Sequence, residues 1–412
     1  MSKKIILFKG GVETLGFFSQ ELEKAFRAMG HETFMYDYDR EAESAYALLR
    51  FLGDGGRDAA VVSFNFHGLC NEDILRDDRN VYIWEEMDIP CYNIVVDHPF
   101  YYDRFMHQLP RRYCQISIDG NHRDYMERFY PEVKTGPFLP LAGTDAGPLL
   151  SRAGADSERE GDRVLSIAER PVDVIFTGSW AEPEFWGQYM AEEGPEYEEF
   201  YRSILKEQIA NPGKTFEEIF EPRIRAEAED AGEITDELLR ETYPHLIHFD
   251  MYVRYLFRGE VVRLLAESGI KVVCIGGGWD KLPCGCPENI IHYGYTNSLE
   301  CLKEIRRAKI SLNVMPWFKR GAHDRIFNTM LNGAVCVTDS SEYLDGILKS
   351  GENCEMYSLD DLCGAVRAVN SLLADPGRMQ EIADNGRRLA LEGHTWAHRA
   401  QELHELIEDE YC

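Results

Sequence analysis

The sequence lacks any long hydrophobic run. None of its 412 residues belongs to a stretch of about 18 consecutive apolar residues, the length that a membrane-spanning helix needs. The first ten residues, MSKKIILFKG, pass from two lysines into a short strand-like run, and their apolar part is too short for an export signal. We therefore expect a cytoplasmic protein that is not an integral membrane protein.

Positive charge is also scarce. The chain has 44 lysines and arginines against 72 aspartates and glutamates, which gives a formal net charge of −28 at pH 7. Nucleic acids and anionic membranes bind surfaces that carry an excess of basic residues, so neither is expected as a partner. A small basic pocket for one anionic ligand remains compatible with this balance.

The cysteines lack the pattern of a disulfide framework or of a metal site. Their number, 11, is odd and they are scattered along the chain, which is typical of reduced thiols. Cys284 and Cys286 form a Cys-Gly-Cys motif, but no second pair follows at the spacing of a zinc site. We predict no metal and no cofactor.

The first half alternates short aliphatic runs with helical periodicity, which predicts a parallel sheet with helical crossovers. Strands are expected at 4–8, 32–36, 59–64, 92–96 and 114–118, with a sixth at 135–140. The loop after the first strand, GGVETLG, does not fit the GxGxxG fingerprint, so dinucleotide binding is not supported. Gly10 and Gly11 in this loop suit either close approach of a ligand or a plain tight turn.

Polar residues follow three of these strands. His67, the pair Asp97 and His98, and Asp119 stand at or just beyond the expected strand ends. Ligands of open α/β folds bind outside the carboxyl ends of the strands. We interpret Asp97 and His98 as catalytic or acceptor-binding candidates and His67 and Asp119 as acceptor contacts, with helix capping or turn formation as the alternative for each.

A polar segment at 143–170, rich in glycine, alanine and charge, separates the two halves, and we place a domain boundary at 165. An expected strand at 172–176 opens the second half, and an acidic region of helical composition follows at 181–255. We predict that this region is a helical insertion. Its aromatic residues are interpreted as helix core, with a sugar-binding platform as the alternative; they are Phe185, Trp186, Tyr189, Tyr197, Phe200 and Tyr201.

Glycines follow two strands of the second half. Gly178 and Ser179 come after the strand at 172–176, and the run Gly-Gly-Gly-Trp at 276–279 comes after an expected strand at 271–275. Three glycines at a strand end indicate close approach of another group to the backbone. A ligand is one such group, and a simple turn is the alternative.

The stretch at 319–339, KRGAHDRIFNTMLNGAVCVTD, combines a basic loop, a short helix and a buried strand. The helix at 326–331 has one apolar face and ends at Gly333, and the strand follows at 334–338. A cationic loop at a helix start suits an anion such as a diphosphate. A solvated surface loop is the alternative.

Five segments occur in a characteristic order between 172 and 403: VDVIFTGSW, IKVVCIGGGW, AKISLNVMP, RIFNTMLNGAVCVTD and HTWAHRAQEL. Together they resemble the C-terminal nucleotide-sugar domain of GT-B glycosyltransferases, in particular the group-1-like family that includes spore-maturation-type glycosyltransferases. In the first half, YNIVVDHPFYY resembles the N-terminal domain that accompanies such transferases.

This resemblance implies an α/β fold of two Rossmann-like domains whose parallel sheets face across a cleft. The acceptor domain would be 1–165, and the nucleotide-sugar domain would be 166–395 with the helical insertion at 181–255. A final helix at 396–412 would cross back to the first domain, and closure about a hinge is expected.

The resemblance also implies a metal-independent glycosyltransferase of the hexosyl- or N-acetylhexosaminyl-transferase class, with a UDP-sugar as the expected donor. The sequence Asp37-Tyr38-Asp39 is interpreted as a turn, so cationic side chains and helix N-termini are expected to stabilise the diphosphate. The catalytic candidates are Asp97, His98 and Arg325. Acceptor contacts are assigned to Gly10, Gly11, His67 and Asp119, and donor contacts to Gly178, Ser179, Gly277, Gly278, Trp279, Tyr295, Lys319, Arg320, His323, Asp324 and Asn328.

Asn328 departs from the family pattern, in which the helix carries a glutamate. Asparagine can hydrogen-bond a ribose or sugar hydroxyl but supplies no charge. A non-catalytic sugar- or nucleotide-binding protein in surface or spore assembly is therefore the main alternative, and an epimerase or phosphorylase of the same architecture is another. The sequence predicts neither the acceptor, nor the stereochemical outcome, nor the oligomeric state.

Overall fold

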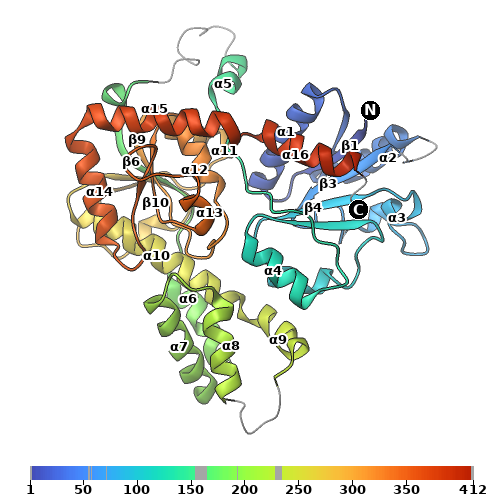
Figure 1. Cartoon of the computed structure of the whole chain (residues 1–412), viewed down its shortest axis with the longest axis horizontal. Coiled ribbons are helices and arrows are strands. Elements are labelled where there is room, and N and C mark those ends of the chain that lie inside the picture. The colour runs from blue at the N-terminus through green and yellow to red at the C-terminus, as the bar shows by residue number, and fades with distance from the viewer. Residues whose placement is uncertain are drawn as a thin grey trace. The chain divides into compact units, whose positions relative to one another are not determined.

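The computed structural model of the chain describes residues 2–53, 56, 58–70, 72–153, 165–192, 194–227 and 234–409. The chain divides into two units: Met1–Ala142 together with His394–Cys412, and Gly143–Gly393 (Figure 1). The chain passes from the first unit to the second at 142–143, earlier than the boundary expected at 165, because the residues from Gly143 onward pack against a helix of the second unit. The middle of the expected linker, 154–164, lies outside the described residues.

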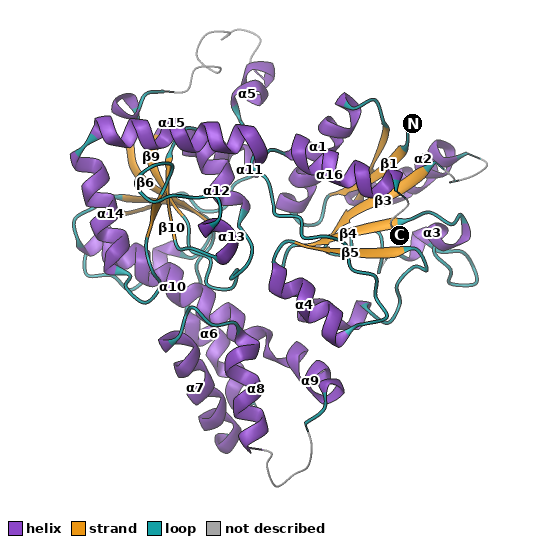
Figure 2. Cartoon of the chain, in the orientation of Figure 1, coloured by secondary structure: helices purple, strands orange, loops and turns teal. Residues whose placement is uncertain are grey.

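Five parallel strands form the sheet of the first unit (Figure 2). They are β1 (Lys4–Lys9), β2 (Glu32–Asp37), β3 (Ala59–Phe64), β4 (Cys91–Val95) and β5 (Tyr113–Ser117), in the order β2-β1-β3-β4-β5. Each lies within one residue of its expected position at either end. The sixth strand expected at 135–140 is wrong: only an isolated bridge joins Thr135 to Gln115, because Pro137 and Pro140 have no N–H group to continue the ladder.

Helices cover this sheet, and the C-terminal helix is one of them. They are α1 (Glu13–Ala28), α2 (Glu41–Leu52), α3 (Ile83–Glu86), α4 (Gly120–Phe129) and α16 (Trp396–Glu408). The apolar stripe of α1 is buried, and its Phe18 ring lies 4.9 Å from the Trp396 ring of α16. The Tyr92 hydroxyl donates to the Leu406 carbonyl at 3.0 Å. The end of the chain therefore completes the core of the first unit.

Six parallel strands form the sheet of the second unit. They are β6 (Val172–Thr177), β7 (Val272–Ile275), β8 (Ile290–His292), β9 (Ala308–Leu312), β10 (Val335–Thr338) and β11 (Glu355–Met356), in the order β11-β10-β9-β6-β7-β8. The chain winds outward from β6 to β8, then returns to β9 on the other side of β6. This reversal between β6 and β9 is the topological switch point of a Rossmann-like sheet.

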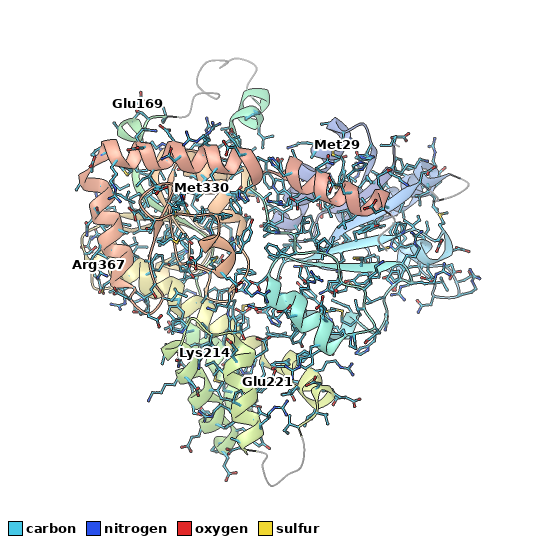
Figure 3. The ribbon with its side chains drawn as sticks, viewed as in Figure 1. Met29, Glu169, Lys214, Glu221, Met330 and Arg367 are labelled. Atoms are coloured by element: carbon cyan, nitrogen blue, oxygen red, sulfur yellow. The ribbon has the colours of Figure 1, made fainter. Side chains whose placement is uncertain are left out.

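The helices of the second unit either cover this sheet or form the insertion. They are α5 (Gly147–Ala153), α6 (Pro183–Gly187), α7 (Pro195–Ala210), α8 (Phe216–Glu227), α9 (Asp236–Thr242), α10 (Ile247–Glu267), α11 (Ser298–Arg307), α12 (Asp324–Leu331), α13 (Glu342–Asp345), α14 (Cys363–Ala374) and α15 (Pro376–Gly393). Met330 of α12 lies in the buried core that α15 covers (Figure 3). None of the helices in the described ranges is long and apolar enough to cross a membrane.

The insertion consists of α6 to α9 and the first half of α10, and Lys214 and Glu221 mark it in Figure 3. The 21-residue α10 runs past the expected end of the insertion at 255. Packed aromatic rings form the insertion core. The centre of the Phe216 ring lies 5.1 Å from that of Phe220, which stacks on it, and 5.5 Å from that of Phe249, which is tilted. The six aromatic residues singled out in the sequence are not all core, since Phe185 and Tyr197 are more than half exposed.

Candidate functional site

The carboxyl ends of β6 and β9 meet at the switch point of the second sheet, where open α/β folds bind their ligands. Arg325, in the first turn of α12, joins these two strand ends. Its Nε donates to the Thr177 carbonyl at 2.6 Å, and its Nη1 donates to Asn313 Oδ1 at 2.7 Å. The side chain is buried, with 6% exposed. The structure therefore fixes a guanidinium, the expected catalytic cation, at the place where a ligand is expected.

Gly178 leaves room beside this guanidinium. Its φ of +151° is one that residues with a side chain rarely adopt, and an added Cβ would lie 3.2 Å from Arg325 Nη2. Any larger residue would therefore crowd the one guanidinium nitrogen that the two strand ends do not hold. Gly178 thus keeps Arg325 Nη2 clear of a neighbouring side chain.

A second arginine, Arg258 of α10, lies against the same loop. Its Nη1 donates to the Ser179 carbonyl at 3.2 Å. The two guanidinium groups share one aromatic neighbour, since their Cζ atoms lie 5.9 Å (Arg258) and 5.0 Å (Arg325) from the centre of the Phe176 ring. Sequence reasoning missed Arg258 because it stands on a mixed helix face close to two other arginines, with no strand end or glycine to mark it.

Neither of these two guanidinium groups forms an ion pair with a carboxylate among the residues that the structure describes. Burial, together with the positive charge of Arg325, lowers the pKa of Arg258 to about 9. Burial also lowers the pKa of Arg325, although Asp324 opposes this effect. Arg325 is buried and Arg258 is partly buried. Two desolvated cations that repel each other gain stability from a shared anion. The arrangement therefore suits an anion with several oxygens.

The start of α12 is arranged by three polar side chains that the sequence assigned to the donor. His323 precedes the helix, and its Nδ1 lies 2.7 Å from Asp324 Oδ1. Burial and Arg325 lower the pKa of His323 to about 4, so the ring is neutral at pH 7. Asn328 Nδ2 donates to Asp324 Oδ2 at 2.9 Å. Both Asp324 oxygens are thus engaged inside the protein.

The amide oxygen of Asn328 binds the first residues of the second unit. Its Oδ1 accepts the backbone N–H of Thr144 at 2.8 Å. One turn later, Asn332 Oδ1 accepts the N–H of Ala146 at 3.1 Å, and its Nδ2 donates to the Thr144 carbonyl at 2.8 Å. An added Cβ at Gly143 would lie 2.4 Å from the α12 backbone. The residues after Ala142 are therefore fastened along α12.

The glycines after β7 pack against protein backbone. An added Cβ at Gly276 would lie 2.5 Å from the Gly178 carbonyl, and one at Gly278 would lie 2.0 Å from the Trp180 carbonyl oxygen. Ser179 Oγ accepts the N–H of Gly277 at 3.2 Å. The close approach that the triple glycine indicated is therefore made by the loop after β6, and the donor contacts of Gly277 and Gly278 stay predictions.

The donor contact of Trp279 also stays a prediction, and the surroundings of its ring disfavour it. The ring is 2% exposed, packs on Phe176 and donates from Nε1 to the Gly178 carbonyl at 2.7 Å. A buried indole fixed in this way supports the Gly178 turn and presents no face to a donor. Tyr295, by contrast, is 82% exposed, and its ring lies so close to Gly277 that an added Cβ would meet it at 2.4 Å. Its donor contact stays a prediction.

Lys319 and Arg320, in the loop between β9 and α12, bind other parts of the protein. Lys319 Nζ donates to the Pro212 carbonyl of the insertion. Arg320 is partly exposed, and its Nε lies 3.7 Å from Glu342 Oε2. Among the basic side chains predicted for the donor, Arg325 is therefore the one that the structure fixes at the switch point.

In the first unit, Gly10 and His67 flank the corresponding switch point between β1 and β3. Gly10 has a φ of +89°, and an added Cβ would lie 3.0 Å from Tyr38 Cβ, so the neighbouring loop accounts for the glycine. Gly11 is exposed, with a φ of +66°. The His67 ring packs edge-on against Tyr38, with centres 5.3 Å apart, and burial lowers its pKa.

The polar residues after β4 and β5 have different environments. Asp97 is partly exposed, and its Oδ2 accepts from Asn65 Nδ2 and from the Tyr102 hydroxyl, both at 3.0 Å. His98 is buried, and its ring lies 4.2 Å from that of Phe100. Asp119 is fully buried, and its Oδ1 accepts the N–H of Asn121 at 2.7 Å at the start of α4. Asp119 is therefore a helix cap, which is the alternative stated for it, and its acceptor contact stays a prediction that the burial disfavours.

Asp339, directly after β10, is a buried carboxyl group close to this site. Its Oδ1 accepts the N–H of Met315 at 2.9 Å. Burial raises its pKa to about 7, although the hydrogen bond from Met315 and the charge of Lys319 oppose the rise. The folded protein therefore binds this proton more tightly than the unfolded chain does. The resulting stability is present below pH about 4 and is lost as the pH rises through about 7.

The Asp339→Asn variant should not show this loss. Asparagine keeps the acceptor for the Met315 N–H and cannot ionise. As the pH rises from 5 to 8, we therefore expect the free energy of unfolding of the variant to increase by about 2–4 kcal/mol relative to that of the native protein. Urea unfolding of both proteins across this range measures the difference. An identical pH dependence of the two unfolding free energies would contradict the raised pKa.

Comparisons with known proteins agree with this architecture. Residues 258–405 match the family described as glycosyl transferase-like, and no curated protein matches the chain. An α-glucosyltransferase in complex with UDP is similar over 99% of this chain and 100% of its own, with a TM-score of 0.59 and 11% identity. The structure of an α-glucosyltransferase with UDP-glucose and DNA containing an abasic site covers 98% and 99%, with a TM-score of 0.53 and 13% identity.

AviGT4, a glycosyltransferase involved in avilamycin A biosynthesis, is similar over 98% of this chain and 97% of its own, with a TM-score of 0.51 and 10% identity. Identities this low bear on the fold alone. The prediction of two Rossmann-like units with parallel sheets is confirmed. The chain has the GT-B fold of glycosyltransferases, and its residues 258–405 match the glycosyl transferase-like family.

Proposed function

We propose that the protein transfers a hexosyl or N-acetylhexosaminyl group from a UDP-sugar to an acceptor without a metal ion. The observation that carries this proposal is the pair of buried Arg325 and partly buried Arg258 at the switch point of the second sheet. A diphosphate between them would supply the direct ion-pair partner that neither guanidinium has among the described residues. The glycosyl transferase-like match, which begins at residue 258, supports the same activity.

The chemistry follows from where charge develops during transfer. As the bond between the sugar and the diphosphate breaks, negative charge grows on the departing phosphate oxygens. Cationic donors that are already fixed in place stabilise this charge without reorganising. Arg325 is held by its bonds to Thr177 and Asn313, and Arg258 by its bond to Ser179, so both are fixed before the donor arrives.

On the acceptor side, Asp97 is the candidate base. Its carboxylate is partly exposed after β4 and is oriented by Asn65 and Tyr102. His98 is less suited to this role, because its ring is buried against Phe100, His122 and Tyr125. An acceptor hydroxyl within hydrogen-bonding distance of Asp97 could lose its proton there.

The choice of a uridine nucleotide rests on the neighbours of similar fold, whose structures contain UDP and UDP-glucose. One of these structures also contains DNA. The net charge of −28 disfavours DNA as a partner of this chain, so the proposed acceptor is not a nucleic acid. It is a glycan, a protein or a small molecule.

Thermal unfolding with UDP, GDP and ADP tests the donor site. We expect UDP at about 100 times its Kd to stabilise the protein by about 2.7 kcal/mol, which raises the Tm by several degrees, with smaller shifts for GDP and ADP. We also expect slow release of UDP from a UDP-sugar without acceptor. No Tm shift with any nucleotide would contradict the donor site. A shift with UDP but no turnover of any UDP-sugar would favour the non-catalytic binding protein.

A further inference from the structure

Asn313, the residue directly after β9, is fully buried at the switch point of the second sheet. Its backbone is fixed on both sides, since its N–H donates to the Val337 carbonyl at 2.8 Å and its carbonyl accepts from the Tyr357 hydroxyl at 2.9 Å. Its side-chain oxygen accepts from Arg325 Nη1 at 2.7 Å, and its Nδ2 donates to Thr338 Oγ1 at 2.9 Å. The neighbouring strand ends therefore set the position of the amide that holds Arg325.

The directions of these hydrogen bonds fix which end of the amide faces Arg325. The Thr338 hydroxyl donates its one proton to the Asp339 carbonyl at 2.7 Å, so it acts as an acceptor toward Asn313. The guanidinium of Arg325 has donors and no acceptor. The amide nitrogen must therefore face Thr338, and the amide oxygen must face Arg325. An amide supplies this donor and this acceptor without carrying a charge.

The two groups that anchor Arg325 are both neutral acceptors: the Asn313 amide oxygen and the Thr177 carbonyl oxygen. The carboxyl groups of Asp324 and Asp339 act on the charge of Arg325 from nearby. Each of them accepts a hydrogen bond from another residue, and neither forms an ion pair with Arg325. Arg325 is therefore held in place without a direct partner of opposite charge among the described residues.

Arg254, one turn before Arg258 on α10, shows the opposite arrangement. Its Nη2 lies 2.7 Å from Oδ2 of the buried Asp250. A carboxylate in direct contact compensates the charge of an arginine inside the protein and leaves less attraction for a ligand. Arg325 keeps this attraction, because its Nη2 makes no hydrogen bond with the described residues and, unlike Arg258 Nε, is not enclosed by the protein.

We propose that Asn313 is a positioning residue that holds Arg325 through a neutral amide, so that the guanidinium keeps its charge for a ligand with two linked phosphate groups. This inference rests on the proposed function, in which that ligand is the diphosphate of the donor. An aspartate at position 313 would have nearly the same size and would still accept from Arg325. It would also pair with the guanidinium directly and repel the phosphates.

Isothermal titration calorimetry on the full chain tests this role, with inorganic pyrophosphate and UDP as probes. Asn313→Asp should weaken the binding of both at least about tenfold, the effect of losing one charge-assisted contact. Uridine carries no phosphate, so its affinity, measured by saturation-transfer NMR, should stay within about twofold of the native value. Asn370→Asp adds the same charge on the exposed face of α14 and should leave all three affinities unchanged.

Asn313→Ala separates this role from support of the fold alone. Alanine removes the acceptor but adds no charge, so it should weaken pyrophosphate binding less than Asn313→Asp does. A residue that only supports the fold would be replaced better by aspartate, which keeps the size and the acceptor, than by alanine. Pyrophosphate binding that is weaker in Asn313→Ala than in Asn313→Asp would therefore overturn the proposal.

Thr338→Val decides the question if circular dichroism shows that Asn313→Asp does not fold. Valine keeps the shape of the threonine and removes the acceptor that orients the amide. Pyrophosphate binding should then weaken about threefold or more, the effect of one neutral hydrogen bond, while uridine binding stays unchanged. Native affinity for pyrophosphate in Thr338→Val would overturn the proposal in that case.

The probes also allow this inference and the proposed function to fail separately. If pyrophosphate and UDP bind the native protein and Asn313→Asp equally well, the inference is overturned and the proposed function stands. If Asn313→Asp weakens pyrophosphate binding but the native protein turns over no UDP-sugar, the inference stands and the proposed function fails. If neither pyrophosphate nor UDP binds the native protein, both are overturned.

Discussion

Replacing Arg325 with alanine is expected to lower kcat/KM for the UDP-sugar by about 10²–10³-fold, the usual effect of removing one fixed donor to developing negative charge. Arg325 is the side chain that bridges the two strand ends of the switch point. Its loss would leave Arg258 as the one remaining guanidinium of the pair, 5.9 Å from the centre of the Phe176 ring. Initial rates of UDP release in the presence and absence of acceptor measure the effect.

Arg320→Ala is the matched control for this experiment. It removes the same charge from the same loop, but Arg320 is partly exposed and lies beside Glu342. Its kcat/KM is expected to stay within about twofold of the native value, because exposed ion pairs contribute little. Circular dichroism and the Tm show whether Arg325→Ala is folded. If Arg325→Ala does not fold, Arg325→Lys replaces it in the assay, because lysine keeps the positive charge and removes the planar guanidinium. Equal rates for Arg325→Ala and Arg320→Ala would remove Arg325 from the mechanism.

Asp97→Asn in the same assay separates the acceptor side from the donor side. This variant should lower transfer to the acceptor and leave the UDP-induced Tm shift intact, because Asp97 and the arginine pair belong to different units. Full transfer activity in Asp97→Asn would exclude Asp97 as the base.

The strands could be located from the sequence because buried parallel strands are short aliphatic runs that end at polar or glycine residues. This is why β3 was placed at its exact bounds and β6 within one residue. Arg325 could also be found, since it stands in a basic loop at a helix start next to a buried strand. These features are local, so a single stretch of sequence contains them.

Arg258 could not be found in this way. Its role depends on the packing of α10 against Phe176, which stands 82 residues before Arg258 in the chain. The residues next to Arg258 in the sequence do not indicate this packing. The same limit explains Trp279 and Asp119. A tryptophan after three glycines and an aspartate at a strand end suit ligand contacts as well as they suit buried packing and helix capping, and burial decides between these roles.

Asn328 is the residue at which sequence and structure differ most instructively. The family pattern has an acidic residue here, and the sequence suggested a ribose contact for the asparagine. In the structure, the two ends of its amide serve two protein partners of opposite kind: the Thr144 N–H needs an acceptor and the Asp324 carboxylate needs a donor. An amide offers both groups, whereas an ionised carboxylate only accepts. The proximity of Asp324 thus accounts for the absence of an acidic residue at position 328.

Asn328→Asp is therefore expected to lower the free energy of unfolding by about 2–3 kcal/mol at pH 8. The change replaces the amide nitrogen with an oxygen at the position that lies 2.9 Å from Asp324 Oδ2. Two carboxylates so close cannot both be ionised without cost, so one pKa rises in the folded state. A group with a raised folded pKa loses its stabilising contribution as the pH rises. The deficit should therefore shrink to about 1 kcal/mol or less at pH 5, as urea unfolding at the two pH values would show.

Asn328→Ala separates this repulsion from the loss of hydrogen bonds. Alanine leaves both Thr144 and Asp324 without their partner but adds no charge, so its deficit of about 1–3 kcal/mol should be nearly equal at pH 5 and pH 8. A deficit in Asn328→Asp that does not change with pH would show that the two carboxylates do not interact. An unchanged stability of Asn328→Ala together with a raised KM for the UDP-sugar would return Asn328 to the donor site, because a ribose contact predicts weaker donor binding and no loss of fold.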